Sequence, residues 1–162
     1  MHESGVRRMT RTAFLAAAMT IGFVGAAQAA DISGLWLNDD RDAAIEISAC
    51  GNALCGHIVW LKAPLDAAGK PAQDVNNPDA ASRIRPLCGL QVIADLAPQS
   101  DGTWDNGHGY DPDSGKSYTL SAQLSGPDTL DLRGYVGMKL MGETETMTRA
   151  PKDLPRCKAG AK

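Results

Sequence analysis

Residues 102–135 read GTWDNGHGYDPDSGKSYTLSAQLSGPDTLDLRGY, and this stretch decides the fold class. Two turn sequences, Asp-Pro-Asp-Ser-Gly at 111–115 and Ser-Gly-Pro-Asp at 125–128, separate three runs that contain aromatic and β-branched residues. Short runs of this kind, interrupted by Gly, Pro and Asp, predict antiparallel strands joined by tight turns. We therefore expect three consecutive strands, at 102–110, 116–124 and 129–135.

The strand pattern continues on both sides of this stretch. Apolar and polar residues alternate at 43–49, where Ile45 and Ile47 share one face, which indicates a strand with one buried side. Further strand-like runs occur at 34–37, 54–61, 89–96 and 138–148. About eight short strands at near-even spacing predict an all-β domain, either an antiparallel barrel or a sandwich.

Residues 62–86 interrupt this pattern with several prolines, a glycine and two adjacent asparagines. A long connection of this kind in a compact domain is often functional. Asn77 suits an N-cap and Pro78 suits the first helical position, so we expect a short helix in this connection that ends before Pro86.

The N-terminus has the organisation of a signal peptide. Three arginines precede an apolar run from Ala13 to Ala27, and Ala27-Gln28-Ala29 fits a signal-peptidase site. The alternative is a retained anchor, but the run is shorter than the roughly 20 residues that a spanning helix needs. We expect residues 1–29 to be removed, which leaves a periplasmic or secreted protein without stable membrane insertion. Residues 30–150 would form the domain and residues 151–162 a C-terminal tail.

The charge balance restricts the class of partner. The formal net charge of the chain is −3 at pH 7, and removal of residues 1–29 takes away three arginines but only one glutamate. An acidic domain without a basic stripe is unsuited to nucleic acid and to anionic membrane surfaces. The sequence does not indicate an oligomeric state.

All four cysteines follow the predicted cleavage site, and an even number in an exported chain predicts disulfides. Cys50 and Cys55 flank a four-residue connection between two strand-like runs, so their side chains would face each other across a hairpin. Cys88 and Cys157 would then pair and tether the tail. The alternative is a redox or metal site, but the Cys50–Cys55 spacing matches neither a thioredoxin motif nor a zinc ribbon.

Two residues at the ends of the domain point to a closed barrel. Gly34-Leu35-Trp36 resembles the glycine-x-tryptophan signature of lipocalins, and Arg149 stands where lipocalin-like barrels place an arginine over that indole. A guanidinium stacked on tryptophan makes a cation–π contact that closes one end of the barrel. We therefore expect structural roles for Trp36 and Arg149.

A wider pattern covers residues 31–150. Its blocks are Cys50-Gly51, Leu54-Cys55-Gly56-x-Ile58-Val59-Trp60-Leu61, Asp74, Asn77-Pro78, Arg83-x-Arg85-Pro86-Leu87-x-Gly89, Tyr110-Asp111-Pro112, Gly115-Lys116-x-Tyr118 and Leu130-x-Leu132-Arg133-Gly134-Tyr135-x-Gly137. In these blocks the chain resembles the DUF2147 family. The resemblance implies an exported bacterial protein with a single antiparallel lipocalin-like β-barrel, and at most a generic small-ligand role. The chain departs from the pattern at Met147, where a tryptophan is expected.

The candidate ligand-binding residues are His57, Trp60, Arg83, Arg85, Tyr110 and Arg133. His57 and Trp60 share a strand, where a partly buried histidine and a core tryptophan are the simpler interpretations. Arg133 is the only cation in an apolar strand pair, and an unpaired charge would be costly there. It either pairs with an acidic residue (Asp74, Asp79 or Asp111) or receives a ligand carboxylate.

One hairpin carries Asp105, His108, Asp111 and Asp113. The spacing Asp111-x-Asp113-x-Gly115 is similar to a calcium loop but lacks its chelating glutamate, so we interpret the cluster as turn chemistry. We predict no metal and no cofactor. No nucleophile elbow, phosphate loop or dinucleotide fingerprint occurs, and the sequence favours a binding protein over an enzyme.

We expect a small apolar or carboxylate-bearing ligand inside the barrel. The small residues Ala44, Ala49, Gly56, Ala94 and Ala122 would leave room for it. One alternative is a filled barrel that docks an envelope protein through residues 62–88. Another is a hydrolase or isomerase that uses His57 or His108 as its base.

Overall fold

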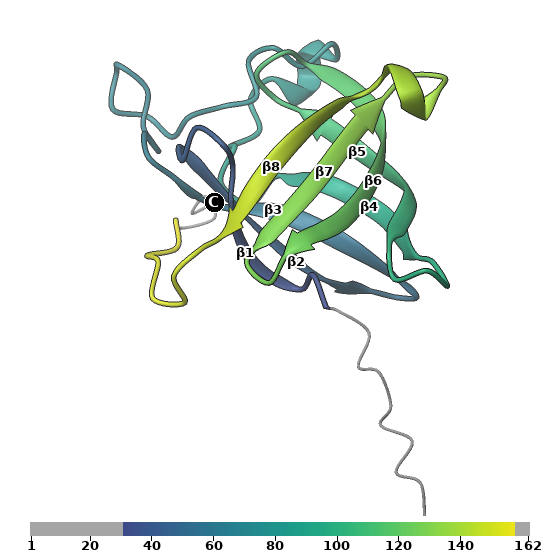
Figure 1. Cartoon of the computed structure of the whole chain (residues 1–162). Helices are drawn as coiled ribbons and strands as arrows, with labels where there is room; N and C mark the ends of the chain where they lie inside the picture. Colours follow the sequence, from purple (N-terminus) through teal and green to yellow (C-terminus); the bar gives the residue numbers. More distant parts are fainter. Residues whose placement is uncertain (1–30, 158–162) are drawn as a thin grey trace, which may run out of the picture.

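A computed structural model describes residues 31–157, so the predicted signal peptide lies outside the described residues. Eight antiparallel strands form a closed barrel, in which β1 also pairs with β8 (Figure 1). The strands are β1 (Gly34–Leu37), β2 (Ala43–Cys50), β3 (Ala53–Leu61), β4 (Gln91–Pro98), β5 (Trp104–Asp111), β6 (Lys116–Gly126), β7 (Thr129–Tyr135) and β8 (Glu143–Arg149). The prediction of an antiparallel barrel of about eight strands is confirmed.

The strand boundaries differ from the predicted ones where glycines or side-chain contacts intervene. β4 and β5 each begin two residues later than expected, because Gly89 and Gly102 have φ of 86° and 83° and belong to turns. The last strand, β8, was predicted to begin at residue 138, but it begins at Glu143. Residues Lys139–Met141 form a 3-10 turn, η2, because the Arg133 side chain donates hydrogen bonds to the carbonyl oxygens of Lys139 and Leu140.

The connection between β3 and β4 contains one 3-10 turn, η1 (Ala80–Ser82), which is the short helical segment expected there. Its N-cap is Asp79 and not Asn77, since the Asp79 carboxylate accepts a hydrogen bond from the Ala81 N–H at 3.1 Å. The Asn77 side chain is engaged elsewhere: its oxygen accepts from the Asp79 N–H, and its amide donates to Asp74 and Tyr110.

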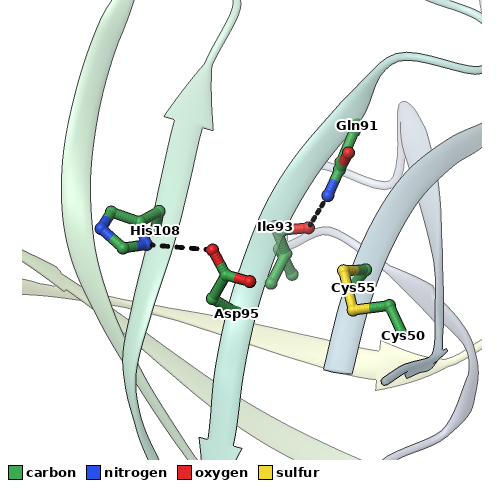
Figure 2. The surroundings of a disulfide bond; sticks show 6 residues. All are labelled: Cys50, Cys55, Gln91, Ile93, Asp95 and His108. Atoms are coloured by element: carbon green, nitrogen blue, oxygen red, sulfur yellow. Dashed lines mark hydrogen bonds and ion pairs between the residues drawn. A yellow bond between two sulfur atoms is a disulfide. The ribbon is translucent and has the colours of Figure 1, made fainter. Parts of the chain in front are cut away.

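Both predicted disulfides are present. Cys50–Cys55 closes the hairpin of β2 and β3 (Figure 2), and Cys88–Cys157 ties the C-terminal tail to the long connection. The Cys157 N–H also donates to the Val59 carbonyl at 2.7 Å, which fixes the tail beside β3.

One end of the barrel is filled by side chains. Trp36, Leu96, Leu130 and Met147 have no exposed surface and form one apolar cluster. The Trp36 indole Nε1–H donates to the Ile32 carbonyl at 2.8 Å, and the Arg149 guanidinium lies 3.9 Å from the Trp36 ring centroid. Met147 takes part in this core in place of the tryptophan expected from the resemblance. This end of the barrel is therefore closed.

The other end carries the long connections. Because successive strands run in opposite directions, the connections after β1, β3, β5 and β7 all leave the barrel at this end (Figure 1). The barrel is thus asymmetric along its axis, with a packed end and an end bordered by loops.

Candidate ligand cavity

A cavity of about 970 Å³ lies in the loop-bordered half of the barrel. This volume falls within the range of about 300–1,000 Å³ that is typical of small-molecule sites. Its apolar wall is formed by Ile45, Ile58, Val92, Ile93, Leu120 and Leu132, together with the rings of Tyr110 and Tyr118. The same strands therefore contribute residues to the packed half of the barrel and to the cavity wall.

Two glycines help to make the hollow half. At Gly109 a Cβ would lie 2.8 Å from the Leu120 side chain, so the absence of a side chain lets Leu120 rest against the backbone of β5. At Gly134 a Cβ would lie 3.5 Å from Tyr118, an ordinary contact, so the wall is simply recessed there. None of the five small residues expected to provide the space lines the cavity. Ala122, for example, is in the packed core, and Ala49 is exposed.

Carboxylates gather around this cavity. They come from the β1–β2 connection, from the end of β5 with its turn, and from β8: Asp40, Asp42, Asp111, Asp113, Glu143 and Glu145. Among the described residues that line the cavity, Lys62 is the only cation. The cavity therefore combines an apolar wall with a strongly acidic border.

The pKa values of two of these carboxyls report their surroundings. Desolvation in the cavity raises the pKa of Glu145, and the negative charges of Asp39 and Asp111 add to the rise, which outweighs the lowering effect of a hydrogen bond from the Asp39 backbone. Burial also raises the pKa of Asp113, with Asp111 and Asp42 as the next contributors. A carboxyl whose pKa is raised lacks full compensation for its negative charge.

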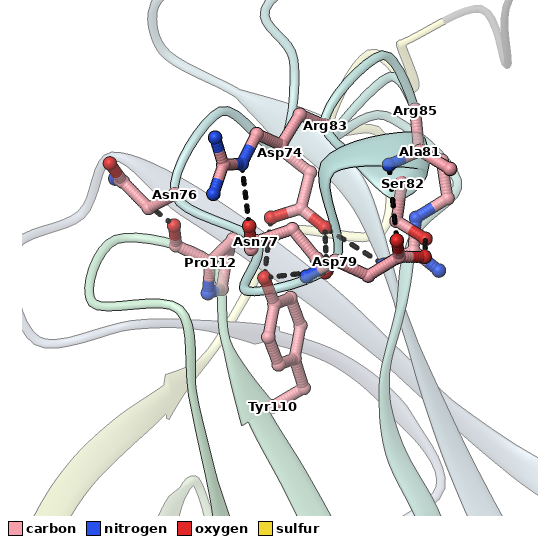
Figure 3. Close-up of polar contacts among 10 residues, drawn as sticks. All are labelled: Asp74, Asn76, Asn77, Asp79, Ala81, Ser82, Arg83, Arg85, Tyr110 and Pro112. Carbon is pink, nitrogen blue, oxygen red and sulfur yellow. Dashed lines mark hydrogen bonds and ion pairs between the residues drawn. The ribbon is translucent and has the colours of Figure 1, made fainter.

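A buried polar cluster fixes the long connection over the cavity wall (Figure 3). Asp74 has no exposed side-chain surface, and its carboxylate accepts hydrogen bonds from Tyr110 Oη at 2.6 Å, Asn77 Nδ2 at 2.8 Å and Arg85 Nη2 at 2.8 Å. Burial alone raises the pKa of Asp74, but these three donors outweigh it and leave the pKa below its ordinary value. The Asp74 carboxylate is thus a fully paired structural charge.

A second contact holds the same connection to the β5–β6 turn. Asn76 Nδ2 donates to the Asp113 carbonyl at 2.8 Å, and a Cβ at Gly115 would come within 2.1 Å of the Asn76 carbonyl oxygen. Gly115, which has a φ of 70°, therefore serves both the turn and the close approach of the connection. The border of the cavity is held by specific contacts.

Of the six candidate ligand-binding residues, Tyr110 lines the cavity and the other five do not. His57 pairs across the sheet with Glu46, a residue that carries the Arg156 ion pair on the outer surface. Trp60 pairs with Ala44, on the strand face opposite to the cavity-lining Ala43 and Ile45. The β3 candidates thus belong to the outside of the barrel.

The three arginines are engaged in structural contacts. Arg83 Nε donates to the Asn77 carbonyl at 2.7 Å, and Arg85 pairs with Asp74. Arg133 pairs with none of the three aspartates proposed for it, because its guanidinium binds two backbone carbonyls of η2 and the hydroxyl of Thr144. Among residues 31–157, therefore, no arginine lies where it would receive a ligand carboxylate inside the cavity.

The acidic side chains and the histidine of the β5–β6 hairpin make separate contacts and do not converge on one site. Asp105 pairs with Lys139 at 2.9 Å, and Asp111 accepts hydrogen bonds from the Asp113 N–H and the Ser114 hydroxyl within the turn. His108 Nδ1 lies 3.7 Å from Asp95 Oδ2 on the outer surface, where both side chains are about three-quarters exposed (Figure 2). Within residues 31–157 no three His, Cys, Asp or Glu side chains are placed to hold a metal ion.

Residues 34–149, which span the barrel from the start of β1 to the end of β8, match the family described as "Uncharacterized protein conserved in bacteria (DUF2147)". The chain belongs to the DUF2147 family. A solved structure described as protein HP1028 from the human pathogen Helicobacter pylori, of the lipocalin family, is similar in fold, with a TM-score of 0.63. The two are 19% identical, and the similarity covers 76% of this chain and 85% of that chain. No curated protein matches the chain.

The fold of this DUF2147 protein is thus a lipocalin-like barrel, as the resemblance implied. In the part of the chain that the structure describes, no helix is long and apolar enough to cross a membrane. The main residues that sequence reasoning missed are Glu143 and Glu145. A signal for them existed, because they alternate with Met147 and so belong to the face that enters the barrel.

Proposed function

We propose that this DUF2147 protein acts outside the cytoplasm and binds a small, partly apolar molecule in its barrel. The observation that carries the proposal is the cavity of about 970 Å³, whose apolar wall adjoins a fully packed barrel end. An apolar cavity with polar groups at one side buries the body of a ligand and orients its polar end. The two disulfides and the signal-peptide pattern support an extracytoplasmic location, since such bonds persist in oxidising compartments.

A neutral fluorescent dye tests whether the cavity binds apolar molecules. N-phenyl-1-naphthylamine is uncharged at neutral pH and becomes fluorescent in apolar surroundings, so we expect a saturable titration with the wild-type protein. Gly134→Phe places a phenyl ring in the cavity, where the recessed wall accepts it, and should abolish the signal.

The matched control for this test is Asp131→Phe. It adds the same side chain to the same strand, but on the outer face, because Asp131 alternates with the inward Leu130 and Leu132. We expect this variant to bind the dye as the wild type does. The same titration curve for the wild type and both variants would place the dye elsewhere and contradict the proposal.

The natural ligand can be identified by native mass spectrometry of the protein isolated from its own host. Excess mass that disappears on denaturation gives the ligand mass. The denatured mass also reports the cleavage site and both disulfides. A homogeneous ligand-free mass, combined with a negative dye titration, would contradict the binding function.

A second candidate function is docking of an envelope protein at the same end of the barrel. Exposed large apolar side chains, between 55% and 87% accessible, gather in two connections there: Leu65, Val75 and Ile84 after β3, and Val136, Met138, Leu140 and Met141 after β7. Several exposed large apolar side chains at one end of a molecule favour an interaction surface there. The cavity shows that the barrel is not filled at this end, so docking would accompany ligand binding instead of replacing it.

Site-specific crosslinking tests this docking surface. A photoreactive residue at position 140 should capture a defined partner in intact cells, whereas the same residue at position 128, exposed at the packed end, should not. Recovery of monomer alone from position 140 would contradict docking. We propose no catalytic role for His57 or His108, because neither lines the cavity.

A further inference from the structure

We propose that the molecule bound in this cavity is an organic cation, with an apolar body and a protonated amine or comparable positive group. The inference rests on the proposed function and adds the charge of the ligand to it. Its basis is the distribution of charge along the wall and the border of the cavity.

The cavity carries negative charge that the protein itself does not neutralise. Six carboxylates line it against one cation, Lys62, and within residues 31–157 none of the six takes part in a salt bridge. The hydrogen bonds that the Asp42 and Asp111 carboxylates accept come from uncharged donors: the Asn38 amide, the Asp113 N–H and the Ser114 hydroxyl. A concave surface of one sign, with low-dielectric walls, concentrates ions of the opposite sign.

Glu145 occupies the position where acidic border and apolar wall meet. It pairs across the sheet with Leu132, which belongs to the apolar cluster, and it lies one inward position from the fully buried Met147. A ligand with its apolar body against Leu132 and Leu120 would therefore present a positive group to Glu145. Desolvation and the like charges of Asp39 and Asp111 disfavour the ionised form of Glu145, and a bound cation would offset both effects.

The arrangement favours an organic cation over the other charged ligands. The described carboxylates are not grouped tightly enough for a metal ion, since no three of them converge as ligands. A ligand carboxylate finds none of the described arginines inside the cavity, and Arg85 and Arg133 are engaged outside it. The carboxylate-bearing ligand expected from the sequence is thus replaced by one of opposite charge.

Three probes with the same chain length separate charge from apolarity: n-octylammonium, 1-octanol and octanoate, titrated calorimetrically into the full mature protein at neutral pH. We expect octylammonium to bind most tightly, octanol less tightly and octanoate least. Glu145→Gln keeps the shape of the side chain and should weaken octylammonium about fivefold or more, with octanol unchanged. Glu145→Lys should abolish octylammonium binding and strengthen octanoate binding.

Asp128→Asn is the control, since it also removes one negative charge but lies exposed at the packed end of the barrel. It should leave all three affinities unchanged. Equal binding of octanol and octylammonium, or tightest binding of octanoate, would overturn the cation inference while leaving the binding function intact. Failure of all three probes to bind would overturn the binding function as well.

Discussion

The hydroxyl of Tyr110 donates a hydrogen bond of 2.6 Å to Asp74 Oδ1, and this bond joins the inner wall of the barrel to the long connection after β3. Tyr110 lines the cavity, whereas Asp74 is fully buried in the connection and also binds Asn77 and Arg85. The wall of the cavity and part of its border are therefore one hydrogen-bonded unit.

Tyr110→Phe removes the only donor that the barrel wall supplies to the Asp74 cluster among the described contacts. A hydrogen bond to a buried charge contributes about 2 kcal/mol, so we expect a loss of that size in urea denaturation. Hydrogen exchange should also become faster in residues 72–87. Tyr118→Phe is the matched control, because Tyr118 lines the same cavity and its hydroxyl has no hydrogen bond within residues 31–157. Equal effects of the two changes would show that the bond does not hold the connection.

The stability of the fold should depend on pH through Asp74. Burial raises its pKa, but the hydrogen bonds from Tyr110 and Arg85 outweigh burial and keep the pKa below 3.8 in the folded chain. The unfolded chain therefore binds this proton at a higher pH than the folded chain does. The stabilisation is complete above about pH 5 and is lost as the pH falls through the folded pKa.

Asp74→Asn removes this titration and should destabilise the fold at neutral pH. The difference in melting temperature between the wild type and Asp74→Asn should shrink as the pH falls from about 5 through the folded-state pKa of Asp74. If this difference in melting temperature stays constant, the Asp74 charge contributes nothing to the loss of stability at acid pH.

Glu145 should show the opposite dependence. Burial and neighbouring negative charges raise its pKa above 4.5, so the folded chain binds this proton more readily than the unfolded chain does. Its favourable contribution is present below the unfolded pKa and disappears as the pH rises through the folded pKa. Glu145→Gln should thus stabilise the ligand-free protein at pH 7, by on the order of 0.5 kcal/mol because solvent in the cavity screens the charge. In thermal melts, the stabilisation by Glu145→Gln should vanish near about pH 4. A loss of stability in this variant at pH 7 would contradict the assignment of Glu145 as an uncompensated charge.

Trp36 should be a principal contributor to stability. Its indole is fully buried, stacked by Arg149 and hydrogen-bonded to Ile32. Trp36→Ala is expected to cost roughly 3–5 kcal/mol in urea denaturation, as truncation of a large core side chain does. Trp60→Ala, on the outer face and only half-buried, should cost less. A loss below about 1 kcal/mol at Trp36 would show that this end of the barrel is not packed as described.

The two disulfides should contribute unequally. Cys88–Cys157 closes a segment with a sequence separation of 69, against 5 for Cys50–Cys55. The chain-entropy relation gives about 4 kcal/mol for the longer loop and about 2 kcal/mol for the shorter one. Paired Cys→Ser variants compared by urea denaturation should show this order, and the reverse order would indicate that enthalpy dominates instead.

The sequence by itself determined the strands and much of the covalent frame. Period-two alternation such as Ile45 and Ile47, and turn residues such as those at 111–115, act locally, so they predict strands without knowledge of the whole fold. Cys50 and Cys55 are likewise close in the chain, and pairing them leaves Cys88 and Cys157 for the second bridge.

Only the tertiary structure decided which charges face the cavity. Arg133 appeared as a lone cation in an apolar strand, but the η2 carbonyls that bind it come from a connection whose path depends on the closed barrel. Glu145 and Asp113 are far apart in the chain from Asp40 and Asp42, and the closure of β8 onto β1 places all four around one space. Local sequence patterns specify which face of a strand is buried. Which side chains meet inside the barrel depends on the register between strands far apart in the sequence, and this register is complete only when all eight strands are paired in the closed barrel.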